Sequence, residues 1–221
     1  MSKSLLCLCA IALITCGCRD DSSNGSSVSS QVSPSHLPIV SVVPLIDNTK
    51  NNYEWSLSDE LSSSLYANLS QQDRVILNAS SKVRAKAKPA LEKNNPFDKD
   101  LSWMKKAFQD EEFVVFLELI EHEEVLNQSR TKPSDPTLCS SDLRMSVRVR
   151  VIDLRSGPKV ILQELIHDAH HIHPQFNHIN FYQVPWKDQS FTISPVGLAH
   201  AKLTKELAQR IEDYILIAVK K

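Results

Sequence analysis

The stretch "LRMSVRVRVIDLRSGPKVILQELIHDAHH", residues 143–171, decides the fold. From Leu143 to Asp153 apolar and polar residues alternate, which is typical of a β-strand with one buried face. Residues 154–158, "LRSGP", contain the glycine and proline of a turn, and a second run rich in aliphatic residues follows. The stretch therefore predicts a β-hairpin.

The charges of this stretch predict a register for the hairpin. Opposite charges face each other across the two strands, and the apolar residues then share the other face. A shift by one residue would break both patterns. The predicted pairs are Asp153 with Lys159, Arg148 with Glu164, and Arg144 with Asp168. The predicted apolar face contains Leu143, Met145, Val147, Val149, Val151, Ile161, Leu165 and Ala169.

The flanking segments predict more strands and helices. Strands are expected over residues 38–47, 74–80 and 112–125, which are rich in β-branched and aliphatic residues. Helices are expected after the capping residue Ser56, over 81–110 in two pieces broken by Pro89 and Pro96, and after Ser194 with Pro195 at its first position. The result is an α/β (α+β) domain over 38–221, with a mixed sheet of about five strands packed by helices, in the order β-α-β-α-β-β-β-α.

Residues 1–18, "MSKSLLCLCAIALITCGC", have the features of an export signal. A positive charge precedes an apolar run, residues 5–14, that is too short to cross a bilayer as a helix. The run ends in small residues and a cysteine, and the segment resembles a bacterial lipoprotein signal peptide. We expect residues 1–17 to be removed after the small Gly17, and Cys18 to carry S-diacylglycerol and N-acyl (palmitate) chains. A plain secretory signal is the alternative.

Residues 18–37 are expected to be the lipid anchor and a flexible tether. Residues 19–37 contain eight serines and almost no bulky apolar side chain. The root-mean-square reach of such a tether is about 25 Å. Arg19 stands where lipoproteins kept in the inner membrane typically have aspartate, which favours the inner leaflet of the outer membrane, facing the periplasm.

Composition excludes several classes of function. The net charge of −1 gives no general attraction for nucleic acid, so no nucleic-acid partner is expected. Glycine occurs only four times, whereas phosphate-binding loops need several glycines close together. We therefore expect no nucleotide and no other cofactor.

The histidines are the first candidate for chemistry. Five of the eight lie between His167 and His178. In a strand His171 and His173 share a face while His170 points to the other, and the predicted register brings Cys139 opposite position 173. These three residues are a candidate Cys-His-His zinc site, and the alternative is a polar strand end without a ligand.

No residues are predicted to be catalytic, because the chain has no G-x-S-x-G turn and nothing near Cys139 indicates a thiol nucleophile. The irregular, aromatic segment 174–193 is a better candidate for function. Its aromatic residues bind a partner or, alternatively, fold over the sheet as part of the core. The candidates for partner binding are Phe176, Phe181, Tyr182 and Trp186.

The order of these segments resembles a superfamily of periplasmic lipoprotein domains. The segments are "VVPLIDNT", "WSLSDELSSSLYANLS", "RVIL", "FVVFLELIE" and "VRVRVIDLRSGPKVILQELI". The superfamily includes the curli secretion lipoprotein CsgG, the synthase activator LpoB and the N-terminal domain of TolB. The chain is also similar to uncharacterised lipoproteins of intracellular Gram-negative bacteria. The resemblance implies a fold and a location more than an activity.

The function expected from the sequence is that of a non-enzymatic, membrane-anchored envelope lipoprotein. It would act in the periplasm through contact with an envelope protein that the sequence does not identify. One alternative is a periplasmic zinc-binding protein that uses the histidine cluster, and another is a subunit of a secretion assembly.

Overall fold

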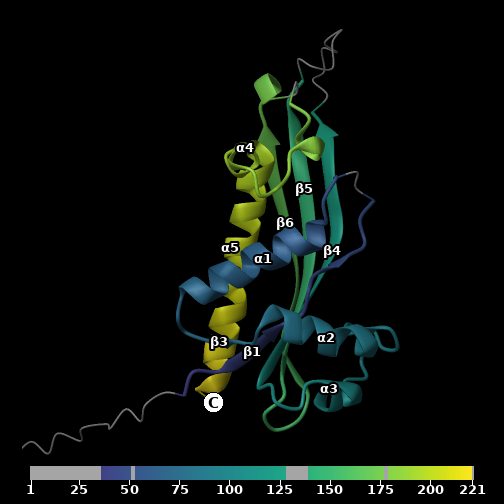
Figure 1. The fold of residues 1–221 in the computed structure, drawn as a ribbon, viewed down its shortest axis with the longest axis vertical. Coiled ribbons are helices and arrows are strands. Elements are labelled where there is room, and N and C mark those ends of the chain that lie inside the picture. Colours follow the sequence, from purple (N-terminus) through teal and green to yellow (C-terminus); the bar gives the residue numbers. More distant parts are fainter. Residues whose placement is uncertain (1–35, 51–52, 128–138, 177–178, 221) are drawn as a thin grey trace, which may run out of the picture. The chain divides into compact units, whose positions relative to one another are not determined.

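Three long antiparallel strands form the centre of the fold (Figure 1). They are β4 (Phe113–Leu126), β5 (Ser141–Asp153) and β6 (Lys159–Ile172). The structure is a computed structural model that describes residues 36–50, 53–127, 139–176 and 179–220, without the side chain of Tyr182.

Short parallel strands complete a mixed six-stranded sheet. They are β1 (Ile39–Val42), β2 (Ile46–Asp47) and β3 (Ile76–Leu77). The order of the sheet is β3-β1-β4-β5-β6, with β2 also beside β4, which confirms the predicted mixed sheet. The single strand predicted over 38–47 is wrong, because Pro44 has no N–H to donate to a ladder. The N–H of Leu45 instead donates to the Ser62 hydroxyl at 2.9 Å.

Two long helices cover one face of the sheet (Figure 1). They are α1 (Leu57–Gln71) and α5 (Pro195–Val219). Both predicted caps are confirmed, since the Ser56 hydroxyl accepts the Asp59 N–H at 3.1 Å and the Ser194 hydroxyl accepts the Gly197 N–H at 3.0 Å. The rest of this layer consists of two 3₁₀ turns, Pro174–Phe176 and Phe181–Gln183, and the short helix α4 (Gln189–Thr192).

The other face is covered near one end by α2 (Ser80–Leu91) and α3 (Ser102–Ala107). The prediction that Pro89 breaks this region is wrong. Pro89 lies inside the last turn of α2, where its missing N–H removes only one helical hydrogen bond. The strand predicted over 74–80 is also shorter than expected, because Ser80 already begins α2.

A β-bulge in β6 changes the register of the hairpin. The predicted pair of Asp153 with Lys159 is confirmed, and Gly157 in the turn has a φ of 120°, which other residues rarely adopt. Beyond the turn the predicted register is wrong by one residue, because Ile161 is an extra residue on its strand. Arg148 therefore faces Leu165 instead of Glu164, and Arg144 faces Ala169 instead of Asp168.

The shifted register also changes which side chains of β6 face the core. Leu162 and Ile166 are buried there, whereas the predicted Leu165 is exposed and Ala169 lies on the opposite face. Glu164 and Asp168, which were expected to pair with arginines of β5, instead face α5. There they form ion pairs with Arg210 at 3.0 Å and Lys202 at 2.6 Å. The predicted β5 residues, from Leu143 to Val151, are buried as expected.

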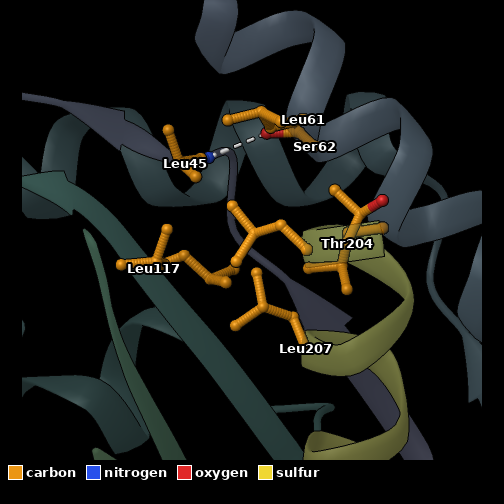
Figure 2. A pocket seen from close by; sticks show the side chains of 9 residues that line it. Leu45, Leu61, Ser62, Leu117, Thr204 and Leu207 are labelled. Atoms are coloured by element: carbon orange, nitrogen blue, oxygen red, sulfur yellow. Dashed lines mark hydrogen bonds between the residues drawn. The ribbon is translucent and has the colours of Figure 1, made fainter. Parts of the chain in front are cut away.

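The core between the sheet and the two long helices is tightly packed. Figure 2 shows a cavity between α1, α5 and β4, where Leu61, Leu117 and Leu207 converge. Its volume is about 10 Å³. A cavity of this size holds at most one water molecule, and its lining is almost entirely apolar. It is therefore a packing gap and not a ligand site.

Replacing Leu207 by alanine should destabilise the protein strongly. Leu207 is 2% exposed and lines the gap, so its truncation enlarges an existing cavity. We expect a loss of about 2–5 kcal/mol in the free energy of unfolding, measured by urea denaturation. Leu198→Ala on the same helix is the control, because Leu198 is 52% exposed and its loss should change stability by less than about 0.5 kcal/mol. Equal losses for the two variants would contradict the packing described here.

Candidate functional site

The predicted anchor residue Cys18 lies outside the described residues, together with the whole predicted signal and most of the tether. Lipidation at Cys18 therefore stays a prediction. Among the described residues, none of the helices combines the length and the apolar character that crossing a bilayer requires.

The histidine stretch is divided between the two faces of β6. His167 and His171 lie on the face opposite α5, and His170 lies on the face towards α5, as the alternation predicts. The His171 ring bonds to the Asp142 carboxylate at 3.0 Å. The His173 Nδ1 atom, just beyond the strand, accepts the Gln175 N–H at 3.3 Å.

The candidate metal ligands His171, His173 and Cys139 are not brought together. Cys139 precedes β5 and His173 follows β6, so neither belongs to the ladder that was expected to align them. Within the parts of the chain that the structure describes, no group of three or more histidine, cysteine or carboxylate side chains is arranged to hold a metal ion.

The aromatic segment 174–193 lies over the core. Phe181 is buried, and Phe176 and Trp186 pack partly against the same core cluster as α1 and α5. The side chain of Tyr182 lies outside the described part of the structure. This placement agrees with the packing alternative, and partner binding by these residues stays a prediction.

A second bulge, in β4, places a histidine inside the core. Leu119 pairs with Val147 and Glu121 pairs with Ser146, so Ile120 is the extra residue. The bulge reverses the alternation of the strand, which would otherwise turn Glu121 and Glu123 towards the helices. His122 points inward instead and is 8% exposed.

The inward His122 ends a buried chain of hydrogen bonds between three elements. Its Nε2 atom lies 2.8 Å from Nε2 of His200 on α5, and Nδ1 of His200 lies 2.6 Å from Oε1 of Glu60 on α1. The second carboxylate oxygen of Glu60 accepts the indole N–H of Trp55 at 2.9 Å. We call Glu60, His200 and His122 the buried triad. Its bonds join α1, α5 and β4.

The hydrogen bonds of the triad restrict the positions of its protons. An ionised carboxylate only accepts, so the proton between Glu60 and His200 lies on Nδ1 of His200, and one further proton lies between the two facing Nε2 atoms. Burial, together with the neighbouring His200 ring, lowers the pKa of His122 to about 3, and the Asp47 carboxylate opposes this only in part. His122 is therefore neutral at physiological pH.

Aromatic rings close the surroundings of the triad. The Tyr53 ring lies edge-on to His122 with centroids 5.4 Å apart, and Trp55 lies edge-on to Phe191 at 5.2 Å. Glu60 and His200 are only 3% and 2% exposed. A substrate cannot reach these groups in this conformation. The hydrogen bonds of the triad therefore serve to hold α1, α5 and β4 together.

Sequence reasoning identified neither Glu60 nor His200. A signal was present: each is a polar residue within the apolar stripe of its helix, His200 one turn before Leu203 and Glu60 beside Leu57 and Leu61. A polar residue on a buried stripe needs a hydrogen-bonding partner. Their partner on β4, His122, could not be predicted, because its inward direction depends on the bulge.

The face of the sheet opposite the triad is covered by described elements only towards one end. Near the β5–β6 turn it is closed, because the buried Arg150 donates to the backbone oxygens of Pro96 and Asp98 at 2.8 and 2.7 Å and holds that loop on the sheet. Figure 1 shows the strands extending past α2 and α3 beyond this point. No described element covers their outer side there. We call this surface the distal hairpin face: Ile120, Glu121, Glu123, Arg144, Leu165, His167, Ala169 and His171.

One serine of the distal hairpin region has neighbours that suggest catalysis. The Ser146 hydroxyl lies 2.5 Å from a Glu121 oxygen and 2.7 Å from His167 Nδ1. A hydroxyl has one proton, and if it donates to the carboxylate then His167 must donate to Ser146. His167 in that state is not a base for Ser146, so the geometry makes the serine a bridge between strands and not an activated nucleophile.

Protonation of His122 should make the folded protein less stable as the pH is lowered. Its folded pKa of about 3 lies below the unfolded value of about 6.5, so the unfolded state binds the proton more readily. The contribution is complete above about pH 6.5 and is lost as the pH falls towards 3. From about pH 7 to about pH 5 we expect a loss of about 2 kcal/mol in the free energy of unfolding.

His122→Gln keeps an amide that can hydrogen-bond to His200 but does not titrate, so urea denaturation of this variant should show a shallower pH dependence. His170→Gln is the control, because it removes a histidine from the same sheet outside the buried triad, and it should change the slope less than His122→Gln does. A slope in His122→Gln as steep as in the unaltered protein would assign the pH dependence to other groups.

The comparisons with known proteins give a fold and a family without an assigned function. No curated protein matches the chain. A hypothetical protein from Chlamydia trachomatis has 22% identity and a TM-score of 0.61, over 81% of this chain and 98% of its own. A protein from Xanthomonas campestris has 7% identity and a TM-score of 0.50, over 86% and 93%. At these identities the similarity shows the fold alone.

A lipoprotein from Neisseria meningitidis has 13% identity and a TM-score of 0.43, over 78% of this chain and 99% of its own. A TM-score this low does not establish a common fold, and the resemblance to TolB, LpoB and CsgG stays a prediction. The model of a family of unknown function matches residues 30–219, which is most of the chain. The chain therefore belongs to the family of unknown function DUF7499.

Proposed function

We propose that the protein is a lipoprotein of the bacterial envelope, anchored through Cys18, that binds another envelope protein through the distal hairpin face. It acts without catalysis, in the periplasm, from the inner leaflet of the outer membrane. The observation that carries the proposal is the open outer side of β4, β5 and β6, which no described element covers.

The chemistry of the distal hairpin face supports a protein partner. Ile120 and Leu165 are 38% and 48% exposed on either side of β5, an apolar content that a contact with another protein would bury. Glu123 and Arg144 pair across the strands beside them and are exposed, so both signs of charge are available for complementary contacts. A sheet face is also flat, whereas small molecules bind in concave sites.

The rigidity of this face also supports the proposal. The three strands are held from behind by the buried triad and by the ion pairs of Glu164 and Asp168 with α5. A surface fixed in this way loses little conformational entropy on binding. A flexible tether over residues 19–37, as the sequence predicts, would let the domain search for its partner while its binding face stays ordered.

The anchor is tested by Cys18→Ala. This change should abolish incorporation of labelled palmitate and move the protein out of the membrane fraction, because the acylated residue is lost. Cys16→Ala is the matched control, two residues away in the same segment, and should leave both readouts unchanged. Palmitate labelling that survives in Cys18→Ala, or that is lost in Cys16→Ala instead, would place the lipid elsewhere.

The binding face is tested by site-specific photo-crosslinking in the bacterial envelope. A photoreactive amino acid at Ala169 or Arg144 should give one discrete adduct with another protein. The same amino acid at Ile193, which is 69% exposed on the α5 side, should not give it. Leu165→Glu should remove the adduct at Ala169 without changing the amount of protein. The adduct forming equally from Ile193, or no adduct from either face position, would overturn the proposal.

A further inference from the structure

The chain enters the described unit at the end of the sheet where the β5–β6 turn lies. The Ile39 N–H donates to a Glu112 carboxylate oxygen at 2.8 Å, and the Glu112 backbone oxygen accepts the Leu154 N–H at 2.8 Å. The start of β1, the start of β4 and the β5–β6 turn therefore meet. Arg155 in the turn donates to the Ala218 backbone oxygen at 2.9 Å, which adds the C-terminal end of α5 to the same place.

A groove opens at this end between the β5–β6 turn and α5. It has a volume of about 350 Å³, and its lining includes Lys159, Ile161, Tyr214 and Ile217. Ile217 is 53% exposed and Tyr214 is 37% exposed. We call this region the tether-side groove.

The charges beside the tether-side groove are partly unneutralised. Arg155 and Asp153 bind each other at 2.7 Å and largely cancel. Lys159 and Lys220 are exposed, and neither lies within ion-pair distance of a described carboxylate, although Lys159 faces Asp153 across the hairpin and also attracts it. Lys159 lines the groove together with Tyr214 and Ile217, and Lys220 follows two residues after the lining residue Ala218. Each ammonium group near an anionic membrane surface gains electrostatic attraction, and an exposed apolar side chain beside it gains from burial at the boundary of the acyl chains.

We infer that the tether-side groove docks on an anionic phospholipid bilayer, with Lys159 and Lys220 at the headgroup phosphates and Ile217 at the boundary of the acyl chains. The inference rests on the proposed lipid anchor for its biological setting. The bilayer is the occupant because the chain enters the unit here, and the root-mean-square reach of the 17 residues between Cys18 and His36 is about 25 Å. The proposed lipid anchor therefore keeps the groove near the membrane.

The expected affinity for the bilayer is weak. It is too low to hold a free domain on the membrane but sufficient to hold a tethered one there. Two lysines near an anionic surface raise partitioning about 30-fold. A short tether adds a high local concentration, so weak docking becomes the prevailing state of an anchored protein. The distal hairpin face lies towards the other end of the same strands, so docking would hold it away from the bilayer and available to a partner (Figure 1).

The test is co-sedimentation of the unlipidated chain, residues 19–221, with vesicles of phosphatidylethanolamine and phosphatidylglycerol. Both core clusters lie within residues 36–221, so this form contains the whole described core. We expect binding at low salt to these vesicles and at least ten-fold less to phosphatidylcholine vesicles. Lys159→Glu/Lys220→Glu should reduce binding to the anionic vesicles by more than about 30-fold.

Lys187→Glu/Lys205→Glu is the matched control, because it makes the same change in net charge at exposed lysines outside the groove. It should keep most of the binding. Ile217→Trp should in addition show a blue shift of its fluorescence with the anionic vesicles. Equal losses in the two double variants, or no preference for anionic vesicles, would overturn the inference. Neither outcome would affect the anchor, which palmitate labelling at Cys18 tests separately.

Discussion

The extra residue at Ile120 is the constraint on which the described structure depends. β4 is the central long strand, and it pairs with β1, β2 and β5. Before the bulge, the odd-numbered residues of β4 from Phe113 to Leu119 face the helices. Beyond the bulge, the even-numbered His122 faces the helices instead. Without the bulge two glutamates would be turned into the core, where an unpaired carboxylate is very costly. With it, Glu121 and Glu123 lie outside, and one histidine finds a partner inside.

Through the buried triad, the bulge in β4 influences how α1, α5 and β4 are aligned. Glu60, His200 and His122 come from three elements far apart in the chain, and each bond needs the others in place. Such a network contributes less to the total stability than the apolar core, but it penalises any other alignment of α1, α5 and β4. Because His122 must be neutral, the alignment also depends on pH.

Much of the architecture was predictable from local patterns. The caps at Ser56 and Ser194, the alternation in β5 and the turn at Gly157 are each fixed by neighbouring residues, and the mixed sheet follows from their order. The two bulges are not local in this sense. A single extra residue at Ile120 or Ile161 leaves no mark on composition or periodicity, because isoleucine fits either face. The predicted register assumed strands without bulges, and the same assumption hid the inward direction of His122. The predicted Cys-His-His alignment assumed in addition that the ladder continues to residues 139 and 173. The prediction for Pro89 was wrong for a different reason, because the free-energy cost of a proline depends on its place within the helix.

Two pairs of histidines lie on opposite sides of one sheet: His122 and His200 in the core, and His167 and His171 on the outer side. This division is tested most directly by labelling with diethyl pyrocarbonate near neutral pH, followed by mass spectrometry of the modified peptides. The account predicts that His167 and His171, on the exposed outer side, are modified readily, whereas His122 and His200 are protected until the protein unfolds. Modification of His122 at the rate of His171 in the folded protein would contradict it, because the bulge at Ile120 would then not turn that side chain into the core.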